Sequence, residues 1–228
     1  MILFFYSNLI NLPKFKNLKM KRLFIVVLLA LGFSSATFAQ QSKGDVEFGF
    51  NLGYNYSTVS NSEGDSTDPG NGINLGASAD YYFSDRWSIK GKMIYDQKGW
   101  NNGFVETYVP TYSYYTTDFN LNYLTILVMA NWHFGSKRNW YLNFGPYAGF
   151  LLSAEETAKS KDVKDSFNST DFGLALGIGV KIPVTDKLKI SLEYDDQTGF
   201  LDVFKINSGS AVRNSRGSFN IGVNFLLK

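Results

Sequence analysis

The chain has 228 residues, with 22 Lys and Arg against 20 Asp and Glu, and it has no cysteine. The absence of cysteine excludes disulfides, thiolate metal sites, cysteine nucleophiles and a lipid-anchoring cysteine. Aromatic residues make up 17% and charged residues only 18%. Soluble domains contain about 25% charged residues, so this composition favours a membrane surface.

The first 39 residues have the pattern of a secretory signal. A basic stretch at 19–22 precedes an apolar run at 23–33, and small residues then lead to a cleavage site at Ala39/Gln40. A transmembrane helix needs about 18 or more apolar residues, which this run lacks. Because Met20 opens a conventional signal, residues 1–19 are expected to be an upstream extension. The predicted organisation is therefore extension plus signal peptide over 1–39 and one domain over 40–228.

Cleavage changes the charge balance of the chain. Residues 1–39 contain five of the 22 basic residues and no acidic residue, so the mature chain has 17 basic and 20 acidic residues and a net charge of −3. No basic patch with interleaved aromatic residues follows. The sequence therefore gives no support to nucleic acid as a partner, and none is expected.

After Gln40 the sequence alternates between apolar and small or polar residues, which is typical of β-strands. Eight such segments are predicted: 46–58, 73–83, 87–98, 120–134, 140–152, 171–182, 188–196 and 217–227. Most reach the roughly 9–11 residues that cross a bilayer at a tilt. Their connections alternate between long (60–72, 101–119, 153–170, 197–216) and short (84–86, 135–139, 183–187). This is the scheme of outer-membrane barrels, with long outer loops, short periplasmic turns and an even strand number.

Alternation alone also allows a soluble barrel that turns its apolar face inward around a ligand. Two features favour the membrane. The polar faces are rich in glycine and other small residues, which suit a narrow lumen. The aromatic residues of the apolar faces gather in two girdles, one at Phe48, Phe83, Trp87, Trp132, Phe134, Trp140 and Phe225 and the other at Tyr54, Tyr56, Tyr95 and Phe150. The predicted fold is an all-β, eight-stranded, antiparallel up-and-down transmembrane β-barrel.

Charged residues at strand positions that alternate with the apolar face, and so are expected to point into the barrel, form the first candidate site. They are Asp80, Lys90, Lys92, Asp96, Lys181, Lys189, Glu193 and Asp195. An eight-stranded lumen has room only for side chains, and confined charges are tolerable when they are paired. We expect a salt-bridge network that plugs the barrel, with a narrow channel as the alternative.

Several segments also resemble the PorT-like outer-membrane β-barrel proteins of Bacteroidetes-type bacteria. The segments are Tyr95–Gly99, Asn122–Leu124, Asn143–Leu152 and Asp171–Gly179. Thr125, Leu127 and the Asp195–Asp196 pair depart from the family pattern. The resemblance implies an outer-membrane barrel over the mature chain and a link to protein secretion.

Residues for catalysis or metal binding are scarce. His133 is the only histidine, and parity directs it inward beside a short turn, which favours a structural role over a Ser-His-acid site. Glu63, Asp65 and Asp68 share one acidic loop, but their spacing matches no ordered calcium loop. The sequence predicts no catalytic residue, no metal and no cofactor.

The second long connection forms the other candidate site because tyrosines concentrate there: Tyr108, Tyr112, Tyr114 and Tyr115, near Phe104. Tyrosine makes large contacts at low entropic cost, so these residues are candidate partner contacts. The alternative is a hairpin that extends beyond the membrane and uses tyrosine as a strand former.

The expected function is that of a non-enzymatic outer-membrane barrel with a structural, adhesive or envelope or secretion-accessory role. The alternatives are a lipid-modifying enzyme and a narrow channel. Expected partners are outer-membrane lipid, the barrel-assembly machinery during biogenesis, and an envelope or secretion-complex protein.

Overall fold

The fold is that of a computed structural model, which describes residues 41–61, 67–107 and 113–227. These residues form antiparallel strands with one short 3-10 helix, η1 (Lys164–Ser166). The strands are β1 (Val46–Ser60), β2 (Asp68–Tyr82), β3 (Trp87–Thr107), β4 (Ser113–Phe134), β5 (Trp140–Glu156), β6 (Lys161–Asp162), β7 (Thr170–Pro183), β8 (Leu188–Gly199) and β9 (Arg213–Leu227). No helix in the described part of the chain is long and apolar enough to cross a membrane.

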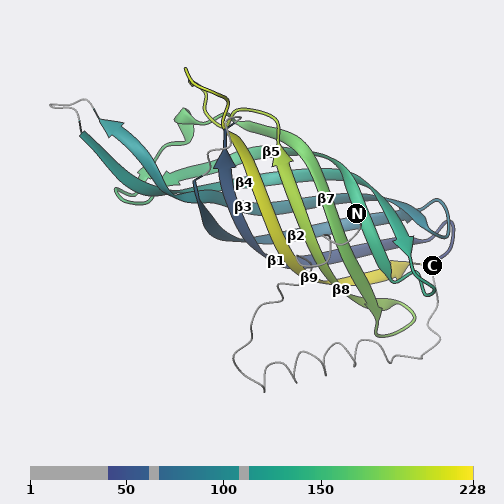
Figure 1. The fold of residues 1–228 in the computed structure, drawn as a ribbon. Helices are drawn as coiled ribbons and strands as arrows, with labels where there is room; N and C mark the ends of the chain where they lie inside the picture. The colour runs from purple at the N-terminus through teal and green to yellow at the C-terminus, as the bar shows by residue number, and fades with distance from the viewer. Residues whose placement is uncertain (1–40, 62–66, 108–112, 228) are drawn as a thin grey trace, which may run out of the picture. The chain divides into compact units, whose positions relative to one another are not determined.

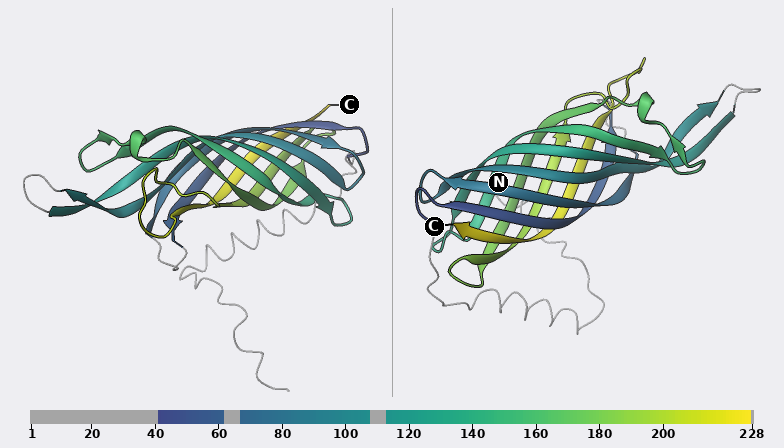
Figure 2. Two further views of the ribbon diagram at one scale, coloured as in Figure 1. Left: turned by 90° about the horizontal axis from the view of Figure 1, so that it is seen from above. Right: turned by 180° about the vertical axis from the view of Figure 1, so that it is seen from behind.

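The eight long strands close into a ring. Each pairs with its neighbours along the chain, and β1 pairs with β9 from Val46↔Leu227 to Ser60↔Arg213. The two-residue β6 is an addition at the edge of β5. Figures 1 and 2 show the tilted strands of this barrel. The predicted all-β, eight-stranded antiparallel up-and-down barrel is therefore confirmed.

Short turns (83–86, 135–139 and 184–187) lie at one end of the barrel and long loops at the other. We call these the turn end and the loop end, and we call residues 157–169 loop 3 and residues 200–212 loop 4. Val46 and Leu227 are paired at the turn end, as an even strand number requires.

Alternation along each strand separates an apolar outside from a polar inside. On β1 the side chain of Leu52 is 51% exposed, whereas that of Asn55 is fully buried. The inside is crowded, because a Cβ on Gly53 would lie 2.1 Å from the side chains of both Asn74 and Asn220. The glycine-rich polar faces are thus explained by close approach across the lumen.

The strands extend further at the loop end than the predicted strand segments, as the hairpin alternative for the second long connection predicts. β3 continues to Thr107 and β4 begins at Ser113, so most of the predicted connection 101–119 is a hydrogen-bonded hairpin. Asn102 has a φ of 55° where the register shifts between Trp100 and Gly103. The hairpin projects past the neighbouring strands (Figures 1 and 2). In this hairpin the backbone pairing of β3 and β4 continues beyond the length that a strand needs to cross the membrane.

A cluster of apolar side chains lies at the loop end, and we call it the aromatic cap. It consists of Val59, Trp100, Phe119, Leu121, Tyr123, Leu151, Ala154, Phe167 and Val203. Phe167 of loop 3 and Phe204 of loop 4 form an isolated β-bridge, and their rings stack at 5.2 Å. The two loops therefore pack together on the strand residues of the cap.

Candidate functional site: a charged lumen and an outer hairpin

Ten charged side chains form one continuous chain of ion pairs inside the barrel, which we call the lumen network. Cations and anions alternate along it in the order Lys189, Glu47, Lys181, Asp80, Lys90, Glu193, Lys92, Asp195, Arg216 and Asp96. All ten are buried. With five cations and five anions the network is formally neutral.

At the turn end the network is held together by Lys181. Its Nζ pairs with Glu47 and with Asp80, the latter at 3.0 Å. Lys189 Nζ lies 2.8 Å from the second oxygen of Glu47, and Lys90 Nζ lies 3.8 Å from Asp80. Five strands, β1, β2, β3, β7 and β8, thus contribute charged side chains to this group.

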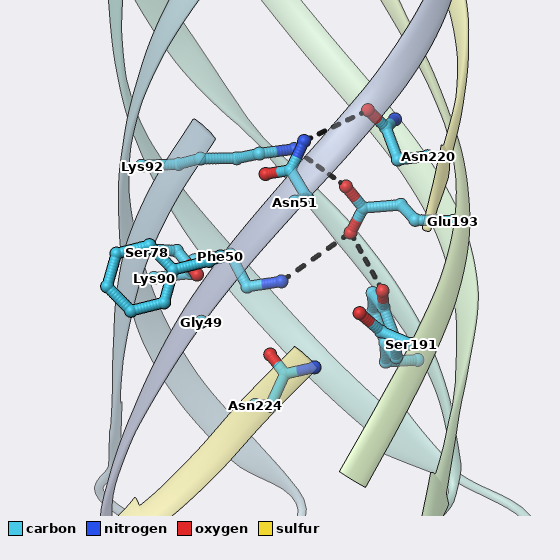
Figure 3. Close-up of a pocket in the computed structure, with 11 residues that line it drawn as sticks. Gly49, Phe50, Asn51, Ser78, Lys90, Lys92, Ser191, Glu193, Asn220 and Asn224 are labelled. Atoms are coloured by element: carbon cyan, nitrogen blue, oxygen red, sulfur yellow. Dashed lines mark hydrogen bonds and ion pairs between the residues drawn. The ribbon is translucent and has the colours of Figure 1, made fainter. Parts of the chain in front are cut away.

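In the middle of the barrel two lysines of β3 reach across to β8. Lys90 Nζ lies 3.5 Å and Lys92 Nζ 2.9 Å from Glu193, and Lys92 also pairs with Asp195 at 3.4 Å. Figure 3 shows Lys90 and Lys92 pointing toward Glu193 across the lumen. The cavity beside them measures about 20 Å³, which is enough for a single water molecule.

Arg216 of β9 ends the network toward the loop end. Its guanidinium pairs with Asp195 and, at 3.2 Å, with Asp96, and its side chain is fully buried. A separate ion pair follows, in which Lys98 Nζ lies 3.1 Å from Asp171. The aromatic cap, through Tyr123, begins next to this pair.

Neutral side chains satisfy further acceptors of the network. Tyr141 and Asn143 on β5 each donate to Glu193 at 2.9 Å, and Asn220 donates to Asp195 at 2.8 Å. Charges in a low-dielectric interior are stable only when such bonds complement the ion pairs. In the lumen, hydrogen bonds from neutral side chains therefore complement the ion pairs.

The eight predicted lumen residues, Asp80, Lys90, Lys92, Asp96, Lys181, Lys189, Glu193 and Asp195, all lie inside the barrel and take part in this network. Sequence reasoning missed Glu47 and Arg216, which complete it, and the separate pair Lys98–Asp171. Parity already directs Glu47 and Lys98 inward, so the signal was present. Arg216 falls in the predicted connection 197–216, so strand alternation does not assign its side chain to the inside or the outside of the barrel.

His133 is buried in the lumen and does not have the surroundings of a catalytic histidine. Its Nε2 lies 3.4 Å from Ser88 Oγ, and Ser88 donates to Asp80 at 3.1 Å. Its Nδ1 has no hydrogen-bond partner among the described residues. In a Ser-His-acid site the acid bonds the histidine, whereas here the acid bonds the serine. The arrangement does not activate Ser88 as a nucleophile.

The described ranges contain no group of three or more His, Asp or Glu side chains placed to hold a metal ion. Of the acidic loop considered above, Glu63 and Asp65 lie outside the described residues. Asp68 begins β2 and accepts a hydrogen bond from Asn102 at 2.7 Å.

The candidate tyrosines of the second long connection divide into three groups. Tyr108 and Tyr112 lie outside the described residues. Tyr115 faces the end of β5 and loop 3: its hydroxyl donates to Glu156 of β5 at 3.3 Å, and Lys159 Nζ of loop 3 lies 3.9 Å from its ring centroid. Tyr114 is 69% exposed and, with Phe104 at 75%, forms an open aromatic face on the hairpin.

A closed ring of strands with an apolar outside and a buried polar inside defines a small transmembrane β-barrel. The model of the family "Outer membrane protein beta-barrel domain" matches residues 38–205. The chain belongs to this family and is an integral protein of the outer membrane. Its turn end therefore faces the periplasm and its loop end the exterior.

Solved structures of small barrels are similar to the chain. Ail, the attachment invasion locus protein of Yersinia pestis, is 16% identical over 81% of this chain and 99% of Ail, with a TM-score of 0.43. OprG from Pseudomonas aeruginosa is 12% identical over 83% and 99%, with a TM-score of 0.49. Neisserial surface protein A is 22% identical over 78% and 96%, with a TM-score of 0.46. No curated protein matches the chain.

Proposed function

We propose that the protein is a non-enzymatic outer-membrane barrel whose lumen is plugged and whose outer hairpin binds another protein of the cell envelope. The observation that carries the proposal is the continuous lumen network, from Lys189 at the periplasmic end to Asp96 toward the outside. A solute would have to separate buried ion pairs in order to pass. Each such separation leaves an uncompensated charge in a low-dielectric interior.

The aromatic cap supports the same proposal as a second barrier. Phe167 and Val203, 2% and 4% exposed, pack over the outer end of the lumen. Asn168 N donates to Val203 O at 2.9 Å, and Lys205 N donates to Ser166 O at 3.1 Å, so loops 3 and 4 hold each other in place. A polar solute entering from outside would meet apolar rings before it reached any charge.

Electrical recording tests the plug. Purified protein inserted into planar bilayers is expected to give no steady, large openings, with folding checked by heat-modifiable migration in gel electrophoresis. The matched control is the quadruple variant Lys92→Ala, Asp96→Ala, Asp195→Ala, Arg216→Ala, which removes two cations and two anions from one part of the lumen as a neutral set and is expected to raise conductance. Steady, large openings of the unaltered protein would refute the plug.

The binding half of the proposal is supported by the hairpin. Phe104 and Tyr114 expose aromatic surface on one face, and exposed aromatic residues on a rigid support are typical of binding sites. No described strand pairs with the outer edge of β3 beyond Asn101, and such an edge can accept a strand of a partner. The resemblance to PorT-like proteins favours a component of a secretion complex as this partner.

A photo-crosslinking amino acid at position 114 tests the hairpin in intact outer membranes. We expect it to capture one envelope protein, and Phe104→Ser in the same chain should reduce that capture while the barrel stays heat-modifiable. The matched control carries the crosslinker at position 115, which faces loop 3 and should yield only crosslinks within the chain. Capture that Phe104→Ser leaves unchanged, or no protein capture at 114, would contradict binding by this face.

The geometry gives less support to the alternative function, a lipid-modifying enzyme, than to the plugged barrel. Such an enzyme needs an activated nucleophile or water, and Ser88, His133 and Asp80 are bonded in an order that supplies neither. Unchanged lipid A in a deletion strain is the expected result, and altered lipid A would revive the enzyme.

A further inference from the structure

A polar pocket lies on the outer wall of the barrel, away from the lumen. It is lined by Asn71, Gln97, Lys98, Asn120, Asn122 and Glu155, and its volume is about 400 Å³. Ligand sites measure about 300–1,000 Å³. We call it the amide pocket, because four of its six lining residues carry side-chain amides.

The strands place the amides next to one another. Gln97 of β3 is paired with Asn122 of β4, and Asn120 of β4 is paired with Glu155 of β5. Strand parity turns these side chains outward, on the same face as the exposed Tyr95. The pocket is therefore part of the wall that faces the membrane and not part of the plug.

Its height along the barrel is set by the outer aromatic girdle. Tyr95 and Leu124 form a pair that lies two strand positions closer to the turn end than the pair Gln97 and Asn122. Leu124 is in turn paired with Phe150 of the girdle. Two strand residues span about 7 Å. Aromatic girdles mark the boundary between lipid tails and headgroups, so the pocket lies level with the headgroups of the outer leaflet.

Several polar groups in the pocket have no partner in the part of the chain that the structure describes. The side chains of Asn71, Asn120 and Glu155 make no hydrogen bond with any described residue, whereas Asn122 donates to Ser153 and Gln97 accepts from Ile73 N. Each free amide can donate and accept at once, as sugar hydroxyl groups do.

The charges of the pocket disfavour phosphate and sulfate. Its one cation, Lys98, is turned to the interior, where its Nζ pairs with Asp171 at 3.1 Å and lies over the rings of Tyr123 and Tyr147. The remaining charged group is the carboxylate of Glu155, which repels anions. An anion site would instead present Arg or Lys side chains to the ligand.

From the free amides, the headgroup level and the lack of an available cation, we propose that the amide pocket binds the uncharged sugar headgroup of an outer-leaflet glycolipid. This site is independent of the plug and of the hairpin. A lipid held there would fix the depth and orientation of the barrel in the outer leaflet.

Lipid titration followed by native mass spectrometry tests the proposal. The protein in detergent is titrated with digalactosyl diacylglycerol, with phosphatidylglycerol of the same acyl chains, and with soluble digalactose. We expect preferential binding of the glycolipid, and about a tenfold loss of affinity in the double variant Asn71→Ala, Asn120→Ala, which removes two hydrogen-bonding side chains.

The matched control is Asn139→Ala, which removes an amide at the periplasmic boundary of the barrel and should leave binding unchanged. Heat-modifiable migration shows that each variant is folded. Equal binding of both lipids, a preference for phosphatidylglycerol, or unchanged glycolipid affinity in the double variant would overturn the proposal. If digalactose binds as tightly as the glycolipid and is lost in the same variant, the ligand is a free sugar and the membrane part of the proposal is wrong.

Discussion

The lumen network and the aromatic cap both fill the barrel, but by opposite means. In the network, buried charges on strands are fixed by the ladder, and each ion serves one or two partners, as Lys181 serves Glu47 and Asp80. In the cap, apolar side chains of loops 3 and 4, such as Phe167, pack on strand residues without any charge. The difference teaches that the network should unfold only with the whole barrel, whereas the cap can open locally.

The largest effect should come from breaking the network at Lys181. Lys181→Met leaves the carboxylates of Glu47 and Asp80 buried with one cation fewer, and loss of one partner of a buried pair costs about 3–5 kcal/mol. We expect that loss in the free energy of unfolding, measured by urea titration of the heat-modifiable form. The control Lys187→Met changes an exposed lysine of the last turn and should stay within about 0.5 kcal/mol. Similar losses in both variants would show that the network does not hold the barrel.

The separate pair Lys98–Asp171 sharpens the comparison because it adjoins the cap. Lys98→Met should cost about 2–3 kcal/mol, since Asp171 keeps its hydrogen bonds from Tyr147 and Asn214, both at 3.1 Å. The double variant Lys98→Met, Asp171→Asn removes both charges and should recover most of that loss, because the unpaired charge is gone. The same urea titration measures both. A double variant no more stable than Lys98→Met would mean that the pair acts through shape and not through charge.

Opening the cap should destabilise the barrel less than breaking the network. Phe167→Ala removes a ring that contacts Trp100, Phe119 and Phe204. We expect trypsin to cleave after the lysines of loops 3 and 4 at least about tenfold faster, while the free energy of unfolding of the barrel falls by less than in Lys181→Met, because the loss cannot exceed the free energy that holds the cap closed. Phe200→Ala is the matched control, because Phe200 is 48% exposed and lies outside the cap cluster. A fall in barrel stability as large as that of Lys181→Met would contradict independent opening.

The sequence was sufficient for the barrel and for most of the lumen, because parity is a local property. Alternation on β3 and β8 alone directs Lys90, Lys92, Glu193 and Asp195 inward. Which of them meet depends on the stagger of strands far apart in the chain, and one residue of slip would exchange every partner. Parity predicts an inward charge and not its partner.

The cap and the amide pocket were beyond sequence reasoning for a different reason. Phe167 and Val203 lie in segments without any period, and their burial arises from contacts between loops 3 and 4. The pocket needs four neighbouring strands in register, so Asn71 and Glu155 have no shared pattern along the chain. Arg216 was missed because β9 begins at Arg213, before the alternation becomes visible at Gly217.

The smallest effect concerns the hairpin where it leans on loop 3 beside the cap. Thr117 Oγ1 donates to Glu156 at 2.6 Å, and this bond holds the pKa of the Glu156 carboxyl below its ordinary value. Because the pKa is lowered, the contact stabilises the folded hairpin at any pH above the ordinary pKa of a glutamate carboxyl. This stabilisation is lost as the pH falls through the lowered pKa of Glu156. Tyr115 donates to the same carboxylate.

Tyr115→Phe keeps the ring beside Lys159 and removes only this hydrogen bond. At neutral pH, hydrogen exchange of the hairpin amides from Ser113 to Thr117 should accelerate about two- to fivefold, the effect of one ordinary hydrogen bond, without a measurable change in barrel stability. Tyr114→Phe is the matched control, because its exposed ring contributes no such bond and exchange should stay unchanged. Equal acceleration in both variants would show that the end of β5 does not hold the hairpin through Glu156, and the open face at Phe104 and Tyr114 would then lack a fixed support.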